Sequence, residues 1–142
     1  MEEGSESGFH FKKILWVLPI AIIPFLFLMF ARGENTSAKL YQQNCANCHM
    51  DDGKGLRGVI PPLAGADFLD SQEDNLPCII KNGLEGKIIV NGISYQQAMP
   101  ANPRMTDADI ANLINYIRNE WGNQAKYMPE SRVKELLKKC EE

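Results

Sequence analysis

Two cysteines and a histidine stand together in the run Cys45-Ala46-Asn47-Cys48-His49. The spacing C-x-x-C-H is typical of the covalent attachment of a c-type haem. Each thiol can add to one vinyl group of the haem, and the adjacent histidine then lies under the iron as an axial ligand. We therefore interpret Cys45 and Cys48 as cofactor-binding residues for one covalent haem, and His49 as a ligand of its iron.

Zinc sites and thiol redox centres also use closely spaced cysteines. A structural zinc ion takes four ligands, usually from two close pairs, but the remaining candidates Cys78, Cys140 and His10 are scattered along the chain. A thioredoxin-type pair lies between a strand and a helix, whereas glycines and prolines follow His49 here. Both alternatives are therefore weaker than the haem interpretation.

The sixth position of such an iron needs a second ligand, and a methionine thioether is a soft ligand used for this purpose. Met50 follows His49 directly and cannot reach the opposite face of the ring. Met99 lies 50 residues after His49 and precedes a proline that favours an extended backbone. We expect Met99 to be the distal metal ligand, in preference to the other two candidates, Met105 and Met128.

The segment 14–31 is apolar, uncharged and just long enough to cross a hydrocarbon core as a helix. It is longer than a usual signal-peptide core, and no small-residue cleavage site follows it, which favours an uncleaved anchor over a cleaved signal. Lys12 and Lys13 precede the segment and only Arg32 follows it at once, so the amino terminus is expected in the cytoplasm. The predicted organisation is a cytoplasmic tail at 1–13, a transmembrane helix at 14–31 and one haem domain at 32–142.

Residues 32–142 carry 13 Lys or Arg against 15 Asp or Glu, a nearly balanced charge. Nucleic-acid binding needs a concentrated basic face, so we expect no nucleic-acid partner.

The periodicity of the domain predicts helices and one small hairpin. Thr106 is a helix cap, and apolar residues recur after it on one face until Trp121, with Gly122 closing the helix. Asn91-Gly92 is the dipeptide that type I′ hairpin turns prefer. Further helices are expected after Thr36 or Ser37, from about Asn75 to Asn82 with Gly83 at its end, and from Pro129 onward.

Three stretches, 41–65, 89–101 and 105–123, resemble class I monohaem cytochromes c, specifically the membrane-anchored bacterial ones. The resemblance implies an all-α, cytochrome c-like domain of three to four helices around the haem, with a small hairpin excursion. It implies that Cys45 and Cys48 are the thioether anchors, His49 the proximal ligand and Met99 the distal ligand. It also implies that the carbonyl of Pro62 accepts the proton of His49 Nδ1.

In such proteins Tyr95 and Trp121 are neighbours of the haem propionates, although simple core packing explains them equally well. The chain departs from the family at Met50, where a glycine usually follows the histidine. Cys78 and Cys140 are surplus to haem attachment, and a disulfide and two free buried thiols remain open alternatives.

An iron with both axial sites filled leaves no room for a substrate, so the expected function is one-electron transfer without enzymatic chemistry and without a small-molecule substrate. The chain would be a membrane-anchored carrier or, by preference, a haem subunit of a respiratory complex with redox protein partners. The expected location is the bacterial cytoplasmic membrane with the haem domain on the periplasmic side. The alternative is a haem enzyme or gas sensor, such as a peroxidase, with an open distal site.

Overall fold

The computed structural model describes residues 36–140. The predicted tail and transmembrane segment, residues 1–31, lie outside this range. Among the residues described, no helix has both the length and the hydropathy that a membrane crossing requires.

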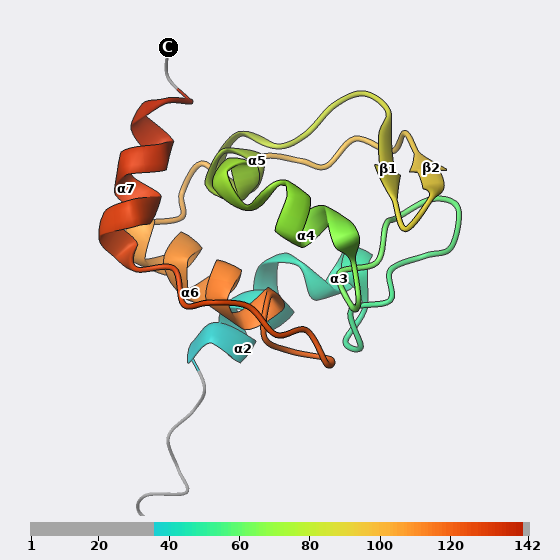
Figure 1. Cartoon of the computed structure of the whole chain (residues 1–142), viewed down its shortest axis with the longest axis horizontal. Helices are drawn as coiled ribbons and strands as arrows, with labels where there is room; N and C mark the ends of the chain where they lie inside the picture. The colour runs from blue at the N-terminus through green and yellow to red at the C-terminus, as the bar shows by residue number, and fades with distance from the viewer. Residues whose placement is uncertain (1–35, 141–142) are drawn as a thin grey trace, which may run out of the picture. The chain divides into compact units, whose positions relative to one another are not determined.

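The regular elements of the described residues are helices and one two-stranded hairpin, as predicted, but there are six α-helices where three to four were expected (Figure 1). The five helices that carry the framework or the candidate site are α2 (Thr36–Asn44), α3 (Ala46–His49), α5 (Leu76–Asn82), α6 (Asp107–Ile117) and α7 (Glu130–Lys138). A short helix α4 (Asp67–Ser71) and a 3-10 turn η1 (Glu73–Asn75) lead into α5, and the hairpin consists of β1 (Ile88–Val90) and β2 (Ile93–Tyr95).

Helices α2 and α6 pack on each other and form the framework of the domain. Tyr41 on α2 is completely buried, with its ring centroid 5.5 Å from Tyr116 and 4.9 Å from Trp121. Its hydroxyl donates to the carbonyl of Met50 at 2.6 Å. The aromatic cluster therefore joins the helix before the C-x-x-C-H segment to the chain just after it.

Helix α6 begins as predicted and ends earlier than predicted. Thr106 and Asp109 form a capping box at its start. The helix stops at Ile117, and Trp121, expected on its apolar stripe, has φ 52° outside the helix. The side-chain amide of Asn123 donates to the carbonyl of Ile117 at 2.7 Å, in place of the backbone N–H that a further helical turn would supply. The helix thus ends before the predicted Gly122, with Arg118 as its C-cap, and the side-chain amide of Asn123 satisfies the carbonyl of Ile117.

The hairpin has the predicted turn, with positive φ at Asn91 and Gly92 and Val90 paired with Ile93. The turn is fastened to the start of α4, because Asn91 N–H donates to Asp67 Oδ1 at 2.8 Å and Asp67 N–H donates to Asn91 Oδ1 at 3.0 Å.

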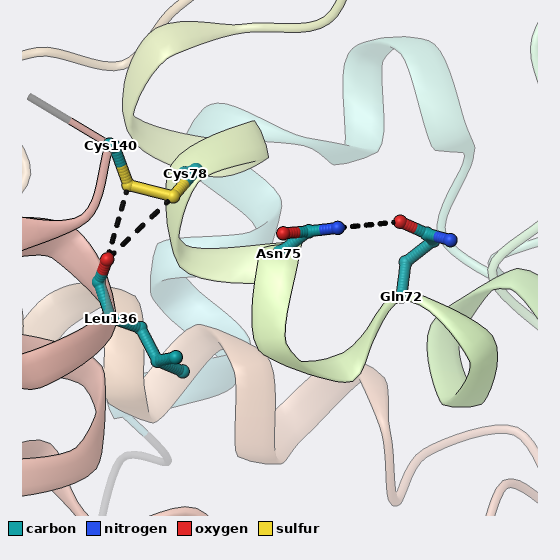
Figure 2. Close-up of a disulfide and its surroundings, with 5 residues drawn as sticks. All are labelled: Gln72, Asn75, Cys78, Leu136 and Cys140. Atoms are coloured by element: carbon teal, nitrogen blue, oxygen red, sulfur yellow. Dashed lines mark hydrogen bonds between the residues drawn. A yellow bond between two sulfur atoms is a disulfide. The ribbon is translucent and has the colours of Figure 1, made fainter. Parts of the chain in front are cut away.

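Cys78 on α5 and Cys140 beyond α7 form a disulfide, which settles the alternative left open by the sequence (Figure 2). Helix α7 also packs on α6 with Val133 and Leu136 buried. The carboxy-terminal segment is therefore part of the domain.

Candidate functional site

An open, mostly apolar cavity lies between α3, the loop after it, α5 and the segment that follows β2. Cys45, Cys48, His49 and Met99 all line it. The walls are formed by side chains from several elements: Ile60, Phe68, Leu69, Ile79, Ile80, Leu84, Ile88, Val90, Leu113 and Ile117 among them.

His49 ends α3 and is held by a backbone carbonyl. Its Nδ1 lies 3.1 Å from the oxygen of Pro61, so the carbonyl acceptor is Pro61 and not the predicted Pro62, which lines the cavity one residue further on. Glycine is required at position 55 in this loop, because a Cβ atom there would lie 2.5 Å from the oxygens of Ile60 and Pro61. Burial is the main cause that lowers the pKa of His49, which keeps the ring neutral and able to act as a ligand.

The two thiols of the motif are free and differ in exposure. Cys45 is half-buried and Cys48 is exposed. Burial, with a smaller contribution from Cys48, raises the pKa of Cys45 to about 11. Both thiols lie at the edge of the cavity next to His49, as attachment to a ring inside it requires.

Met99 reaches the cavity from the segment after β2, far along the chain from α3. Its backbone pairs with that of Leu84: Leu84 N–H donates to the carbonyl of Met99 at 3.0 Å, and Met99 N–H donates to the carbonyl of Leu84 at 2.9 Å. Gly83 permits this pairing, since a Cβ atom there would lie 2.6 Å from the Met99 oxygen. Gly83 follows α5, as predicted, and its φ of 82° is a value that favours glycine.

Tyr95 and Trp121 are buried or half-buried but are not among the residues that line this cavity. Tyr95 pairs with Ile88 in the hairpin. Trp121 donates its indole N–H to the carbonyl of Asp51 at 3.0 Å and packs on Tyr41. These contacts agree with the packing interpretation, and the placement of both residues beside the haem propionates stays a prediction.

Sequence reasoning missed Pro61 and Leu84, which act through their backbones, and Asn123, which acts through its side-chain amide. Pro61, Leu84 and Asn123 each fix a segment of the site by main-chain or amide hydrogen bonds. Asn123 bridges Gly65 and Leu63 on the loop to the end of α6. Only Asn123 carried a signal, as an asparagine beside a glycine at the expected helix end.

The donor set fits a covalently attached haem and does not fit zinc. Two free thiols, a neutral imidazole and a thioether face one apolar cavity. A zinc site would need further thiolates or imidazoles, but Cys78 and Cys140 are bonded to each other. In the described part of the chain, no cluster of three or more His, Cys, Asp or Glu could hold a metal ion.

Comparison with known proteins gives the same assignment. The sequence model of the cytochrome c family matches residues 35–121. Cytochrome c-552 of Thermus thermophilus is 36% identical over 100 residues, which cover 68% of this chain and 67% of that protein.

Two longer relatives match over a similar part of this chain. The cytochrome c subunit of alcohol dehydrogenase (quinone) of Gluconobacter oxydans is 35% identical over 64% of this chain but only 19% of its own length. The cytochrome c subunit of gluconate 2-dehydrogenase of Pantoea cypripedii is 33% identical over 76% of this chain and 25% of its own length. The chain belongs to the cytochrome c family and carries the covalent c-type haem of that family.

Proposed function

We propose that this chain is a membrane-anchored monohaem cytochrome c that passes one electron at a time. Cys45 and Cys48 would hold the haem, and His49 and Met99 would fill the two axial positions of its iron. The observation that carries the proposal is that these four side chains, from segments 50 residues apart, line one apolar cavity.

The haem supplies, when bound, an iron that changes between the ferric and ferrous states. The carbonyl of Pro61 holds Nδ1 of His49, which leaves Nε2 as the nitrogen available to a metal and raises its basicity. The apolar walls exclude water and keep the site in a low dielectric, which disfavours extra charge on the iron and so raises the potential. Met99, as the second ligand of the iron, would add to that effect and would leave no open site for a substrate.

The segment 14–31 supports a membrane anchor by its length and lack of charge. With the positive residues on its amino-terminal side, the haem domain lies on the extracytoplasmic face of a bacterial cytoplasmic membrane. The disulfide between Cys78 and Cys140 supports this location, because such bonds persist in oxidising compartments.

The chain would serve as a haem subunit of a respiratory electron-transport complex. Two kinds of observation support a subunit over a free carrier: relatives that are cytochrome c subunits of dehydrogenases, and the short stretch between residue 31 and α2, which restricts roaming. Gentle detergent extraction and identification of co-migrating chains tests the assembly. A haem protein that migrates alone at every detergent concentration contradicts it, and release of the intact chain by carbonate washing contradicts the anchor.

The ligand assignment is tested by three matched substitutions, Met99→Leu, Met105→Leu and Met128→Leu. Met105 and Met128 are buried core residues at 7% and 3% exposure, so they control for the loss of a methionine as such. We expect only Met99→Leu to lower the midpoint potential and to let carbon monoxide bind the ferrous protein rapidly. An unchanged spectrum and potential in Met99→Leu would remove Met99 from the iron. Rapid carbon monoxide binding to the unmodified protein would favour the enzyme or sensor alternative.

A further inference from the structure

The backbone that presents Met99 is attached to one short helix. Leu84, two residues beyond α5, makes the two hydrogen bonds to Met99 described above. Asn102 N–H donates to the carbonyls of Ile80 and Lys81 on α5, at 3.2 Å each. The ammonium of Lys81 donates to the carbonyl of Met105 at 2.7 Å. The segment from Met99 to Met105 is therefore positioned by the carboxy-terminal half of α5.

Helix α5 has seven residues, too few for a helix to be stable by itself. Its support comes from packing on α6 and α7 and from the disulfide of Cys78. Figure 2 shows this bridge between α5 and the end of α7, with the carbonyl of Leu136 facing both sulfurs at 3.4 Å from Cys140 and 3.9 Å from Cys78. Cys78 and Cys140 line a groove together with Ile79, which also lines the cavity that holds the four candidate haem residues.

We propose that the Cys78–Cys140 disulfide is a positioning element for Met99. Reduction of the disulfide by a dithiol would then make Met99 leave the sixth coordination position of the iron more often. This inference rests on the proposed ligation by Met99. This position opens when Met99 moves away from the iron together with its segment. That motion loosens the hydrogen bonds from the segment to α5 and to Leu84. A covalent tie at Cys78 limits the local unfolding of α5 on which such opening depends.

The bridge is accessible to a reductant. Both cysteines are half-buried and line an open groove together with Phe68, Ile79 and Leu84. A dithiol would transfer two electrons and two protons to the bridge, which becomes two thiols, and the dithiol itself would be oxidised to a disulfide. The same groove shares Phe68, Ile79, Leu84 and Ile88 with the haem cavity, so the bridge and the cavity have a common wall.

The test measures carbon monoxide binding to the full-length ferrous protein under two reductants. Ascorbate reduces the iron and leaves the disulfide intact, whereas dithiothreitol reduces both. We expect binding to be faster with dithiothreitol, on the order of tenfold, which corresponds to about 1.4 kcal/mol in favour of the opened state. Thiol counting confirms the state of the bridge in each arm.

Two variants separate positioning from general stabilisation. In Cys78→Ser combined with Cys140→Ser, binding should be fast and equal under both reductants. Arg132→Ala removes the ion pair of Arg132 with Asp74 at 2.9 Å, which ties α7 to η1 without involving α5. In ascorbate, Arg132→Ala should bind carbon monoxide as slowly as the unmodified protein. If the double variant does not fold, the two arms of the unmodified protein still decide the question.

The outcomes are distinct. Equal slow rates in both arms, with the bridge shown to be reduced, overturn the positioning role and leave Met99 as ligand. Fast binding already in ascorbate shows that Met99 does not hold the iron, and the proposed ligation then fails first. Faster binding in Arg132→Ala to the same extent as in the double serine variant assigns the effect to general loosening of α7 and also overturns the inference.

Discussion

The indole of Trp121 covers the backbone of Gly53, where a Cβ atom would lie 2.5 Å from Trp121 Cε3. Gly53 has φ 65°, and its carbonyl accepts from Leu63 N–H at 2.7 Å and from Ala64 N–H at 2.9 Å. Trp121 in turn donates to the carbonyl of Asp51. These contacts fold the loop after His49 back onto the end of α6, and they leave room for glycine alone.

Replacement of this glycine should therefore be severe. Gly53→Ala adds a clash with the indole to an unfavourable positive φ, and we expect a loss of about 2–4 kcal/mol in the free energy of unfolding. Gly58→Ala is the matched control, because Gly58 has φ 77° and nothing within 4 Å of its Cβ position. It should lose only about 1 kcal/mol in guanidinium unfolding. Equal losses of unfolding free energy in the two variants would show that the Trp121 indole can move aside at no cost in stability.

The sequence predicts those parts of the site that depend on local spacing. The C-x-x-C-H run, the Asn91-Gly92 turn and the cap at Thr106 each follow from residues close together in the chain. The true end of α6 depends instead on Asn123 reaching back to Ile117, and no periodicity reports that contact.

The carbonyl partner of His49 illustrates the same limit. Pro61 and Pro62 are chemically alike, and only the folded loop shows that the Pro61 oxygen lies 3.1 Å from His49 Nδ1. Likewise, the disulfide requires that α5 and the end of α7 meet, with the Cα atoms of Cys78 and Cys140 5.7 Å apart across 62 residues. Tertiary packing decides such distances, so a single sequence leaves them open.

The contact between Gly83 and Met99 predicts a local effect on the iron site. Gly83→Ala places a Cβ 2.6 Å from the Met99 oxygen, which must move the segment that carries the thioether. We expect a lower midpoint potential and a weaker methionine-to-iron charge-transfer band. Gly86→Ala is the control, since Gly86 has φ 93° but nothing within 4 Å of its Cβ position. It should leave potential and band unchanged. The same shift in both variants would attribute the effect to backbone strain rather than to displacement of Met99.

Met50 occupies a backbone region that favours glycine, with φ 63° and ψ 164°. Its side chain is 39% exposed, so little packing offsets the strain. Met50→Gly should stabilise the domain by about 1 kcal/mol, the relief of strain less the extra entropy of glycine in the unfolded chain. Met50→Ala keeps the β-carbon and should give no such gain in thermal or guanidinium unfolding. A gain in Met50→Ala equal to that in Met50→Gly would assign the effect to the side chain beyond the β-carbon.

The capping box of α6 predicts a pH-dependent contribution to stability. The side chain and the backbone N–H of Thr106 both donate to Asp109 Oδ2, at 2.7 Å and 3.0 Å, and these bonds lower the pKa of Asp109. Because the carboxylate is favoured in the folded state, its stabilisation is complete above the unfolded pKa of about 3.9 and is lost as the pH falls through the lower folded pKa.

Asp109→Asn should therefore lose roughly 0.3–1 kcal/mol at neutral pH and low salt, and the gap to the unmodified protein should narrow as the pH falls below about 4. Guanidinium unfolding of both proteins at several pH values measures that gap, and acid-induced changes at the haem cancel in the difference. Asp107→Asn removes a carboxylate from the same first turn outside the capping box. If the difference in unfolding free energy between Asp109→Asn and the unmodified protein stays constant from neutral pH to below about pH 4, the hydrogen bonds of Thr106 do not favour the ionised form of Asp109.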